Sequence, residues 1–214
     1  MTRTVIATGG AALLLSAALI AQGGRPASPA GSSATQVGGK YDTSGAEPVY
    51  RGGKWIEITY GRPIKRGRDI FGGTGDNYGK TANPDAPVWR AGANVSTQLK
   101  TEVPLVINGK TVAPGTYTMF IDLKPNNWTL IISNWKAATT FNPSNDANKT
   151  GEVFGAYGYS PEKDVVRAAM KTSTVPFSVD QLTWNFTDMS DAGGNITIMW
   201  DRMTASVPFR VGGQ

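Results

Sequence analysis

The chain has 214 residues, of which 40% are hydrophobic and 17% charged, with a formal net charge of +5, which fits one globular domain rather than two. It contains neither cysteine nor histidine, which excludes disulfides, thiol nucleophiles, Ser-His-Asp catalysis and the common zinc sites. We therefore expect no cofactor and no metal, and an enzyme of this sequence would depend on carboxylates, Lys, Tyr, Ser or Thr.

The first 22 residues have the pattern of an export signal. Arg3 supplies the positive start, and the apolar run AALLLSAALIA covers residues 11–21. A membrane span is the rival interpretation, but it needs roughly 20 apolar residues and a basic cluster after them, and this run has neither. We predict a cleaved signal peptide at residues 1–23, no transmembrane segment after cleavage, and a periplasmic or extracellular location.

The next segment, residues 24–47, is rich in Gly, Ser, Ala, Pro and Thr and poor in large apolar side chains. Such a segment buries too little apolar surface to offset the entropy that it loses on ordering. The sequence therefore predicts a flexible linker at 24–47 and a folded domain at 48–214.

From Pro48 onward, apolar residues recur at every second position, which is the period of a half-buried strand. The alternating runs are residues 117–123, 128–132, 182–186, 196–200 and 205–211. Asn108-Gly109 lies between two short apolar runs, which is the strongest local signal for a β-hairpin. Roughly eight to ten short strands with such turns predict an all-β fold, a single antiparallel β-sandwich of jelly-roll or Ig-like type, with a barrel as the alternative.

Two long polar stretches interrupt this pattern, at residues 72–87 and 136–152. Long loops are where a sandwich most often carries its function. Tyr157, Tyr159 and Trp135 flank the second stretch. We expect these three aromatic rings at the surface, because the others are in phase with the apolar face of the strands.

One group of residues has the composition of a ligand-binding site. Its members are Arg62, Arg66, Arg68, Trp89, Arg90 and Asn94. Guanidinium groups bind carboxylate, phosphate or sulfate through paired hydrogen bonds, tryptophan stacks on a sugar face, and asparagine binds hydroxyls. The group therefore predicts a site for a small anionic or carbohydrate ligand.

Bracing is the alternative role for these residues. Arg62 and Arg68 would pair with Asp69 or Glu57 to pin an irregular loop, while Trp89 fills the core. The sequence favours bracing for the arginines, because nothing in it shows that they converge. The cluster at residues 62–68 is also too short a basic run to indicate a nucleic-acid partner, and none is expected.

Four aspartates invite comparison with a glycosidase, which needs two acids facing one bond. They are Asp164, Asp188, Asp191 and Asp201. Three of them adjoin predicted turns, where aspartate is common because it hydrogen-bonds to nearby backbone. We therefore favour turn structure over catalysis for these residues.

Several sequence blocks occur in a recognisable order. They are YGRP at 60–63, KRGRDIFG at 65–72, VWRAGAN at 88–94, APGTYTMF at 113–120, FGAYGY at 154–159 and DVVR at 164–167. Together they resemble an exported bacterial family catalogued as domain of unknown function 2911, over about residues 60–211. The resemblance implies an extracytoplasmic β-sandwich and assigns no activity.

The leading functional hypothesis is a non-catalytic exported binding module for an anionic or hydroxyl-rich ligand. Its alternatives are a carboxylate-dependent hydrolase acting on glycans or peptides, and a structural envelope protein whose arginines only brace loops. Two carboxyl groups about 5 to 10 Å apart in a cleft would favour the hydrolase. Solvated, converging guanidinium groups would favour binding, and guanidinium groups saturated by protein acceptors would favour a structural role.

We expect the exported protein to begin between Ala21 and Ala27, because the apolar run after Arg3 has the features that signal peptidase recognises. Mass spectrometry of the mature N-terminus checks this expectation. Intact Met1 in a membrane fraction would contradict it.

Overall fold

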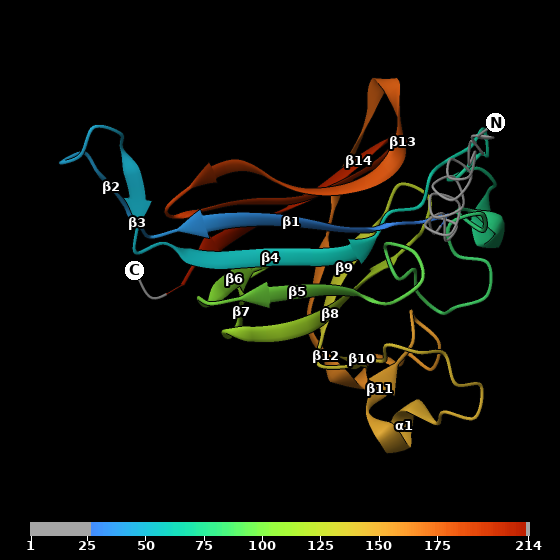
Figure 1. Cartoon of the computed structure of the whole chain (residues 1–214). Helices are drawn as coiled ribbons and strands as arrows, with labels where there is room; N and C mark the ends of the chain where they lie inside the picture. Colours follow the sequence, from blue (N-terminus) through green and yellow to red (C-terminus); the bar gives the residue numbers. More distant parts are fainter. Residues whose placement is uncertain (1–26, 213–214) are drawn as a thin grey trace, which may run out of the picture.

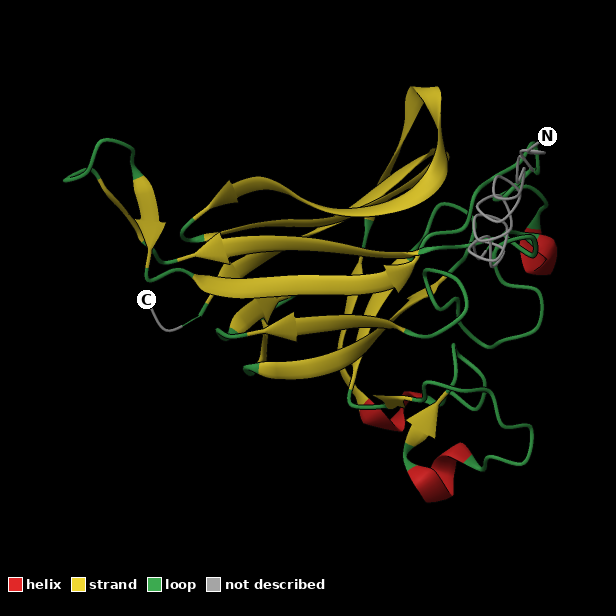
Figure 2. Cartoon of the chain, in the orientation of Figure 1, coloured by secondary structure: helices red, strands yellow, loops and turns green. Residues whose placement is uncertain are grey.

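Strands dominate the computed structural model, which describes residues 27–212 (Figures 1 and 2). None of its sheets closes into a barrel, so the prediction of an all-β, sandwich-like fold is confirmed over the barrel alternative. The predicted signal peptide at residues 1–23 lies outside the described residues. Between residues 27 and 212, no helix has the length and apolar character needed to cross a bilayer.

The larger sheet has six strands in the order β1-β4-β5-β8-β9-β12, and all neighbours are antiparallel. Its strands are β1 (Ala30–Val37), β4 (Lys54–Gly61), β5 (Thr97–Thr101), β8 (Gly115–Asp122), β9 (Thr129–Ser133) and β12 (Asp164–Ala169). The second sheet has four antiparallel strands in the order β13-β14-β6-β7. These are β6 (Leu105–Ile107), β7 (Lys110–Val112), β13 (Lys171–Ser190) and β14 (Gly193–Val211).

Short elements lie at the two ends of the sandwich (Figure 1). At one end, β2 (Lys40–Asp42) and β3 (Val49–Arg51) form a projecting hairpin. At the other end lie the parallel pair β10 (Lys136–Ala137) and β11 (Glu152–Val153), the helical turn α1 (Ala147–Thr150), and the 3-10 turns Gly75–Asn77 and Pro161–Lys163.

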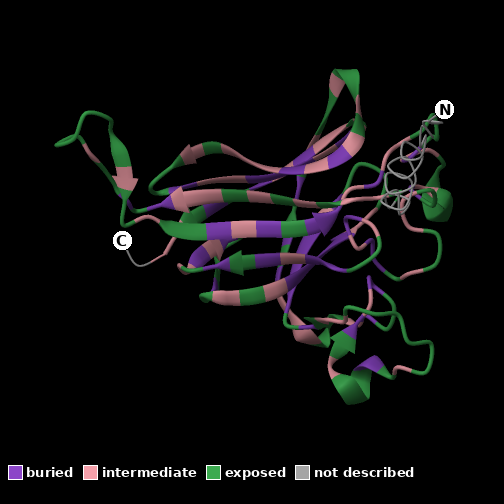
Figure 3. Ribbon diagram, in the orientation of Figure 1, coloured by how far each residue is buried: buried purple, intermediate pink, exposed green. Residues whose placement is uncertain are grey.

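The main core lies between the two sheets and follows the predicted alternation. On β4, the side chains of Ile56, Ile58 and Tyr60 are buried, while the positions between them face outward (Figure 3). Leu182 and Trp184 of β13 are fully buried opposite them, as their phase predicts. Burial of one face of each strand therefore joins the sheets.

A second apolar cluster covers the outer face of β8 and β9. The side chains of Phe120 and Ile131 are fully buried there, against Trp135 and Val153 of the long connection between β9 and β12. The sequence predicted one buried face for each strand, which is wrong for β8 and β9, because the 134–163 connection folds back over them. The long connection is thus anchored to the sheet by its own core.

The segment 24–47 differs from the predicted linker. Residues Ala30–Val37 form β1, whose register with β4 runs without a break from Ala30 opposite Gly61 to Val37 opposite Lys54. Small polar side chains suffice for this strand because its pairing comes from backbone hydrogen bonds to β4. The linker prediction rested on side-chain composition, which does not show this backbone pairing.

The predicted hairpin at Asn108-Gly109 is confirmed. The two residues have φ values of 49° and 73°, and they connect Ile107 directly to Lys110 across the β6–β7 ladder. Two positive φ angles in a two-residue connection are the signature of a type I′ turn, which matches the twist of paired strands.

We expect Trp184→Ala to lower the free energy of unfolding by about 3 to 5 kcal/mol, because it deletes a large ring that is fully buried between the sheets. Denaturant unfolding measures the change. Phe177→Ala is the matched control, because that ring is 57% exposed on the same strand. Similar losses in both variants would contradict the assigned core.

Candidate functional site

A pocket of about 630 Å³ opens at the end of the sandwich where the two longest connections meet. The β4–β5 connection contributes Arg68, Arg90 and Asn94, and the β9–β12 connection contributes Phe141, Phe154 and Tyr157. Trp200 of β14 forms part of the wall. The volume lies within the usual range for sites that enclose a small molecule.

Three of the six residues predicted for a site therefore lie together in this pocket, namely Arg68, Arg90 and Asn94. Both long stretches singled out in the sequence also contribute, since Thr81 and Phe141 are among the lining residues. The sequence predicted that these loops carry the function, and the structure shows that they line one cavity.

The other three predicted residues do not line the pocket. Trp89 is 1% exposed and packs inside an aromatic cluster, because β-type pairing of its backbone with Ile121 turns its ring into the core. Arg62 lies half-buried against β13, where Nε donates to the carbonyl of Leu182 and Nη2 to Oγ1 of Thr183, both at 3.4 Å. The bracing role thus describes Arg62, although its acceptors are neutral.

Arg66 does not line the pocket. The residue is exposed and has a φ of 50°, at the corner of the turn that precedes Gly67. The prediction that all six residues build one site is corrected on this point, because the tight turn at 65–68 separates neighbouring side chains.

The guanidinium groups of Arg68 and Arg90 are held by neutral acceptors. Arg68 donates from Nε to the carbonyl of Lys65 at 3.0 Å and from Nη2 to that of Ile64 at 2.7 Å. Arg90 donates from Nη1 to the carbonyl of Asn94 at 2.6 Å. Throughout the part of the chain that the structure describes, neither group forms an ion pair with a carboxylate.

Aromatic rings position these guanidinium groups. The Cζ atom of Arg90 lies 5.3 Å from the ring centre of Tyr157, and that of Arg68 lies 6.0 Å from the ring of Trp200. Phe141 packs at 5.6 Å from Phe154 and 5.9 Å from Tyr157, centre to centre. The pocket therefore combines positive charge with flat apolar walls.

A glycine lets Arg90 take this position. Gly155 has a φ of 64°, and a Cβ atom there would lie 2.5 Å from Cζ of Arg90. Any larger residue would therefore displace the guanidinium group as well as strain the backbone.

The loop under the pocket has an unusual backbone. Ala91 and Asn94 have φ values of 51° and 62°, a region that residues other than glycine occupy at a cost. The carbonyl of Ala91 accepts hydrogen bonds from Nε1 of Trp184 at 2.9 Å and from Oγ1 of Thr97 at 3.2 Å. These buried bonds hold the turn in its strained conformation.

The four aspartates considered for catalysis are dispersed, and none lines the pocket. Asp164 accepts from Tyr159 and Arg167, Asp188 from Asn195, Asp191 from Tyr50, and Asp201 pairs with Lys65. Burial, together with the hydrogen bond to Asp164, raises the pKa of Tyr159 above its ordinary value. This hydroxyl thus stays protonated and serves as a donor within the network.

The burial of some aromatic rings differs from the sequence prediction. Trp135 and Tyr159 were expected at the surface and are buried between the 134–163 connection, to which they belong, and the sheet, whereas Tyr157 is exposed as expected. Trp200 was expected in the core; it is buried there but also contributes to the pocket wall. The two-residue period of the strand could not show that a ring buried in the core also lines the pocket.

The fold and the pocket define an extended two-sheet β-protein with a cationic, aromatic-lined cavity at one end of its sandwich. The chain belongs to the family described as "Protein of unknown function (DUF2911)", whose match covers residues 45–209. The family resemblance noted in the sequence is confirmed. No curated protein and no solved structure matches the chain significantly.

Proposed function

We propose that this domain is a non-catalytic binding module for a small organic anion, held in the pocket between Arg68 and Arg90, and that it acts outside the cytoplasm. The single observation that supports the proposal is the composition of the pocket. Two guanidinium groups line it, and no carboxylate does so among the described residues. Two like charges that lack an acidic partner attract an anion.

The free donors of the two arginines favour the same ligand class. Nη1 of Arg68, and Nε and Nη2 of Arg90, have no acceptor among residues 27–212. Guanidinium groups donate in a planar fork that matches the oxygens of carboxylate and phosphate. An anionic group in the pocket would complete these hydrogen bonds.

The walls favour a ligand that also has a flat apolar part. Phe141 is 58% exposed, and the rings of Phe154, Tyr157 and Trp200 lie beside the two arginines. Stacking on the accessible rings of Phe141 and Tyr157 would contribute affinity that a bare inorganic anion cannot obtain. We therefore favour an aromatic or ring-containing carboxylate or phosphate ester.

The alternatives find less support in this pocket. A carboxylate-dependent hydrolase needs two acids around one bond, and this pocket has no acid among its described lining residues. A structural brace uses its donors on the protein, as Arg62 does with Leu182 and Thr183. Arg90 uses only Nη1 in this way and keeps Nε and Nη2 for a ligand, whereas Arg68 uses Nε and Nη2, as Arg62 does, and differs from Arg62 by lining the pocket.

Isothermal titration calorimetry with phenyl phosphate tests the proposal, with benzyl alcohol as the neutral counterpart. We expect phenyl phosphate to bind and benzyl alcohol not to. Arg68→Gln and Arg90→Gln should each weaken binding at least about tenfold, because a hydrogen bond to a charged group contributes about 1.5 to 3 kcal/mol. Gly155→Ala should weaken it as well, because it displaces Arg90 and leaves the charge unchanged.

Arg66→Gln is the matched control. It removes the same charge two residues from Arg68 but lies outside the pocket. Equal losses from Arg66→Gln and Arg90→Gln would assign binding to overall charge and contradict the site. A parent protein that takes up no phenyl phosphate would overturn the proposal.

A further inference from the structure

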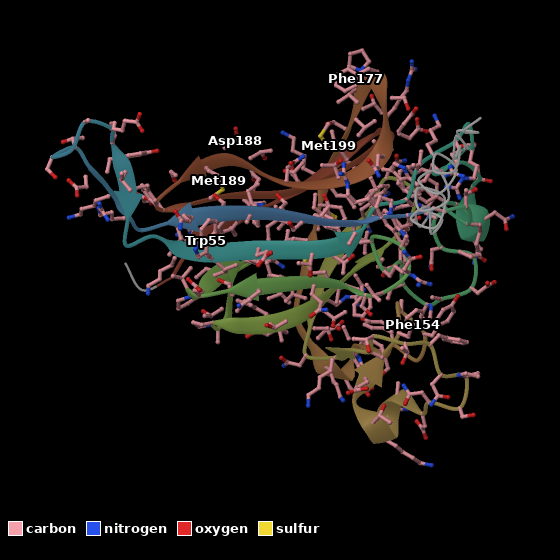
Figure 4. The ribbon with its side chains drawn as sticks, viewed as in Figure 1. Trp55, Phe154, Phe177, Asp188, Met189 and Met199 are labelled. Atoms are coloured by element: carbon pink, nitrogen blue, oxygen red, sulfur yellow. The ribbon has the colours of Figure 1, made fainter. Side chains whose placement is uncertain are left out.

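We propose a second binding site, a groove for a neutral polysaccharide chain on the outer face of the six-stranded sheet, centred on Trp55. It is separate from the anion pocket and does not depend on it. Figure 4 shows Trp55 near one end of the sheet and Phe154, which lines the anion pocket, near the other.

Three neighbouring hollows make up this groove. The first, about 770 Å³, lies between the β2–β3 hairpin and Trp55, and the second, about 310 Å³, lies beside Trp55 and Glu57. The third, about 530 Å³, continues past Glu57 to Thr59. Trp55 and Ala34 line both the first and the second hollow, and Glu57 lines both the second and the third, so the three lie next to one another.

The alternation of β4 accounts for this arrangement. Ile56 and Ile58 face the core, so Trp55, Glu57 and Thr59 all project from the outer face. A strand advances about 3.4 Å per residue, which puts about 14 Å between the first and last of these positions. The groove therefore suits an extended chain rather than a single small molecule.

Trp55 is the exposed aromatic anchor of the groove. It is 48% exposed, whereas each of the other five tryptophans is at most 3% exposed. Its backbone is fixed by Glu102, whose Oε2 accepts from the Trp55 amide at 2.8 Å and whose amide donates to the Trp55 carbonyl at 2.9 Å. A large flat ring on a rigid strand loses little entropy on binding.

Two tyrosines extend the aromatic surface at the hairpin end. Tyr41 is 69% exposed and contacts the ring of Tyr50 edge to face at 5.2 Å. The Tyr50 ring lies directly on Gly39 and Gly53, where a Cβ atom would come within 2.5 and 2.6 Å of the ring. Its hydroxyl accepts from the amide of Gly39 and donates to Asp191, so this ring is also fixed in place.

The charges of the groove favour a neutral ligand with many hydroxyl groups. Three carboxylates and two ammonium groups line it, from Glu57, Glu102, Asp191, Lys40 and Lys100. Glu57 and Lys100 lie opposite each other on β4 and β5. Alternating donors and acceptors beside an aromatic ring suit sugar hydroxyls and the C–H faces of a pyranose, while the acids disfavour a polyanion.

A peptide strand is a poorer occupant. Peptides add to a sheet through free backbone groups at its edge. The groove is centred on Trp55 of β4, whose backbone groups are already paired with β1 on one side and β5 on the other. Recognition there depends on side chains.

Affinity electrophoresis in native gels tests the proposal, with soluble β-glucan, xylan, galactomannan, amylose or dextran in the gel and alginate as the polyanionic comparison. We expect at least one neutral polysaccharide to retard the parent protein. Trp55→Ala should weaken that binding at least about tenfold, the effect of removing one aromatic anchor. Phe177→Ala should bind as the parent does, because its ring is exposed on β13 away from the groove (Figure 4).

Arg90→Gln separates this proposal from the anion pocket, since it should leave polysaccharide binding unchanged. Iodide quenching of tryptophan fluorescence gives a direct readout, because Trp55 is the one exposed indole of the six. The retarding polysaccharide should protect Trp55 from iodide.

Three outcomes would overturn the proposal. The first is unchanged mobility of the parent in every neutral gel, and the second is equal retardation of the parent and Trp55→Ala. The third is protection of Trp55 that rises with protein concentration in the absence of polysaccharide, which would assign the groove to a second copy of the chain.

Discussion

The pocket depends on one buried side chain, Trp184, that connects the two sheets and the loop above them. Its ring is fully buried in the main core. Its amide donates to the hydroxyl of Tyr60 on β4 at 3.1 Å, and its indole Nε1 donates to the carbonyl of Ala91 at 2.9 Å. This indole bond and the bond from Oγ1 of Thr97 to the same carbonyl each contribute about 0.5 to 1.5 kcal/mol net, and together they offset the strain of the left-handed turn at Ala91, about 1 to 3 kcal/mol. The core therefore fixes the loop that presents Arg90 and Asn94.

The two proposed binding sites are built in different ways. At one end, connections supply guanidinium groups and aromatic rings around a pocket. Along the outer face of the larger sheet, regular strands present Trp55 and a row of polar side chains. A loop-built pocket can enclose a small ligand, whereas a strand-built face repeats at a fixed spacing and suits a chain. Both proposals thus follow from how each surface is constructed.

The sequence was enough to predict the sandwich and the phase of Trp184 from its periodicity, and the hairpin from Asn108-Gly109. It missed β1, because a strand of small polar residues is stabilised by backbone pairing that composition does not show. It brought Arg68, Arg90 and Asn94 into one hypothesis but also included Trp89, whose direction depends on a long-range bridge to Ile121. Phe141 and Trp55 could not be found, since their exposure depends on tertiary packing rather than on local pattern.

Hydrogen exchange of Trp184→Phe, followed by mass spectrometry, tests most directly whether the core holds the pocket loop. Phenylalanine retains most of the buried ring but removes the donor to Ala91. We predict faster exchange in residues 89–94, where the amide of Ala93 donates to Gly61, with little change in the amides of β14. Unchanged exchange in residues 89–94, or equal acceleration throughout β14, would contradict the account.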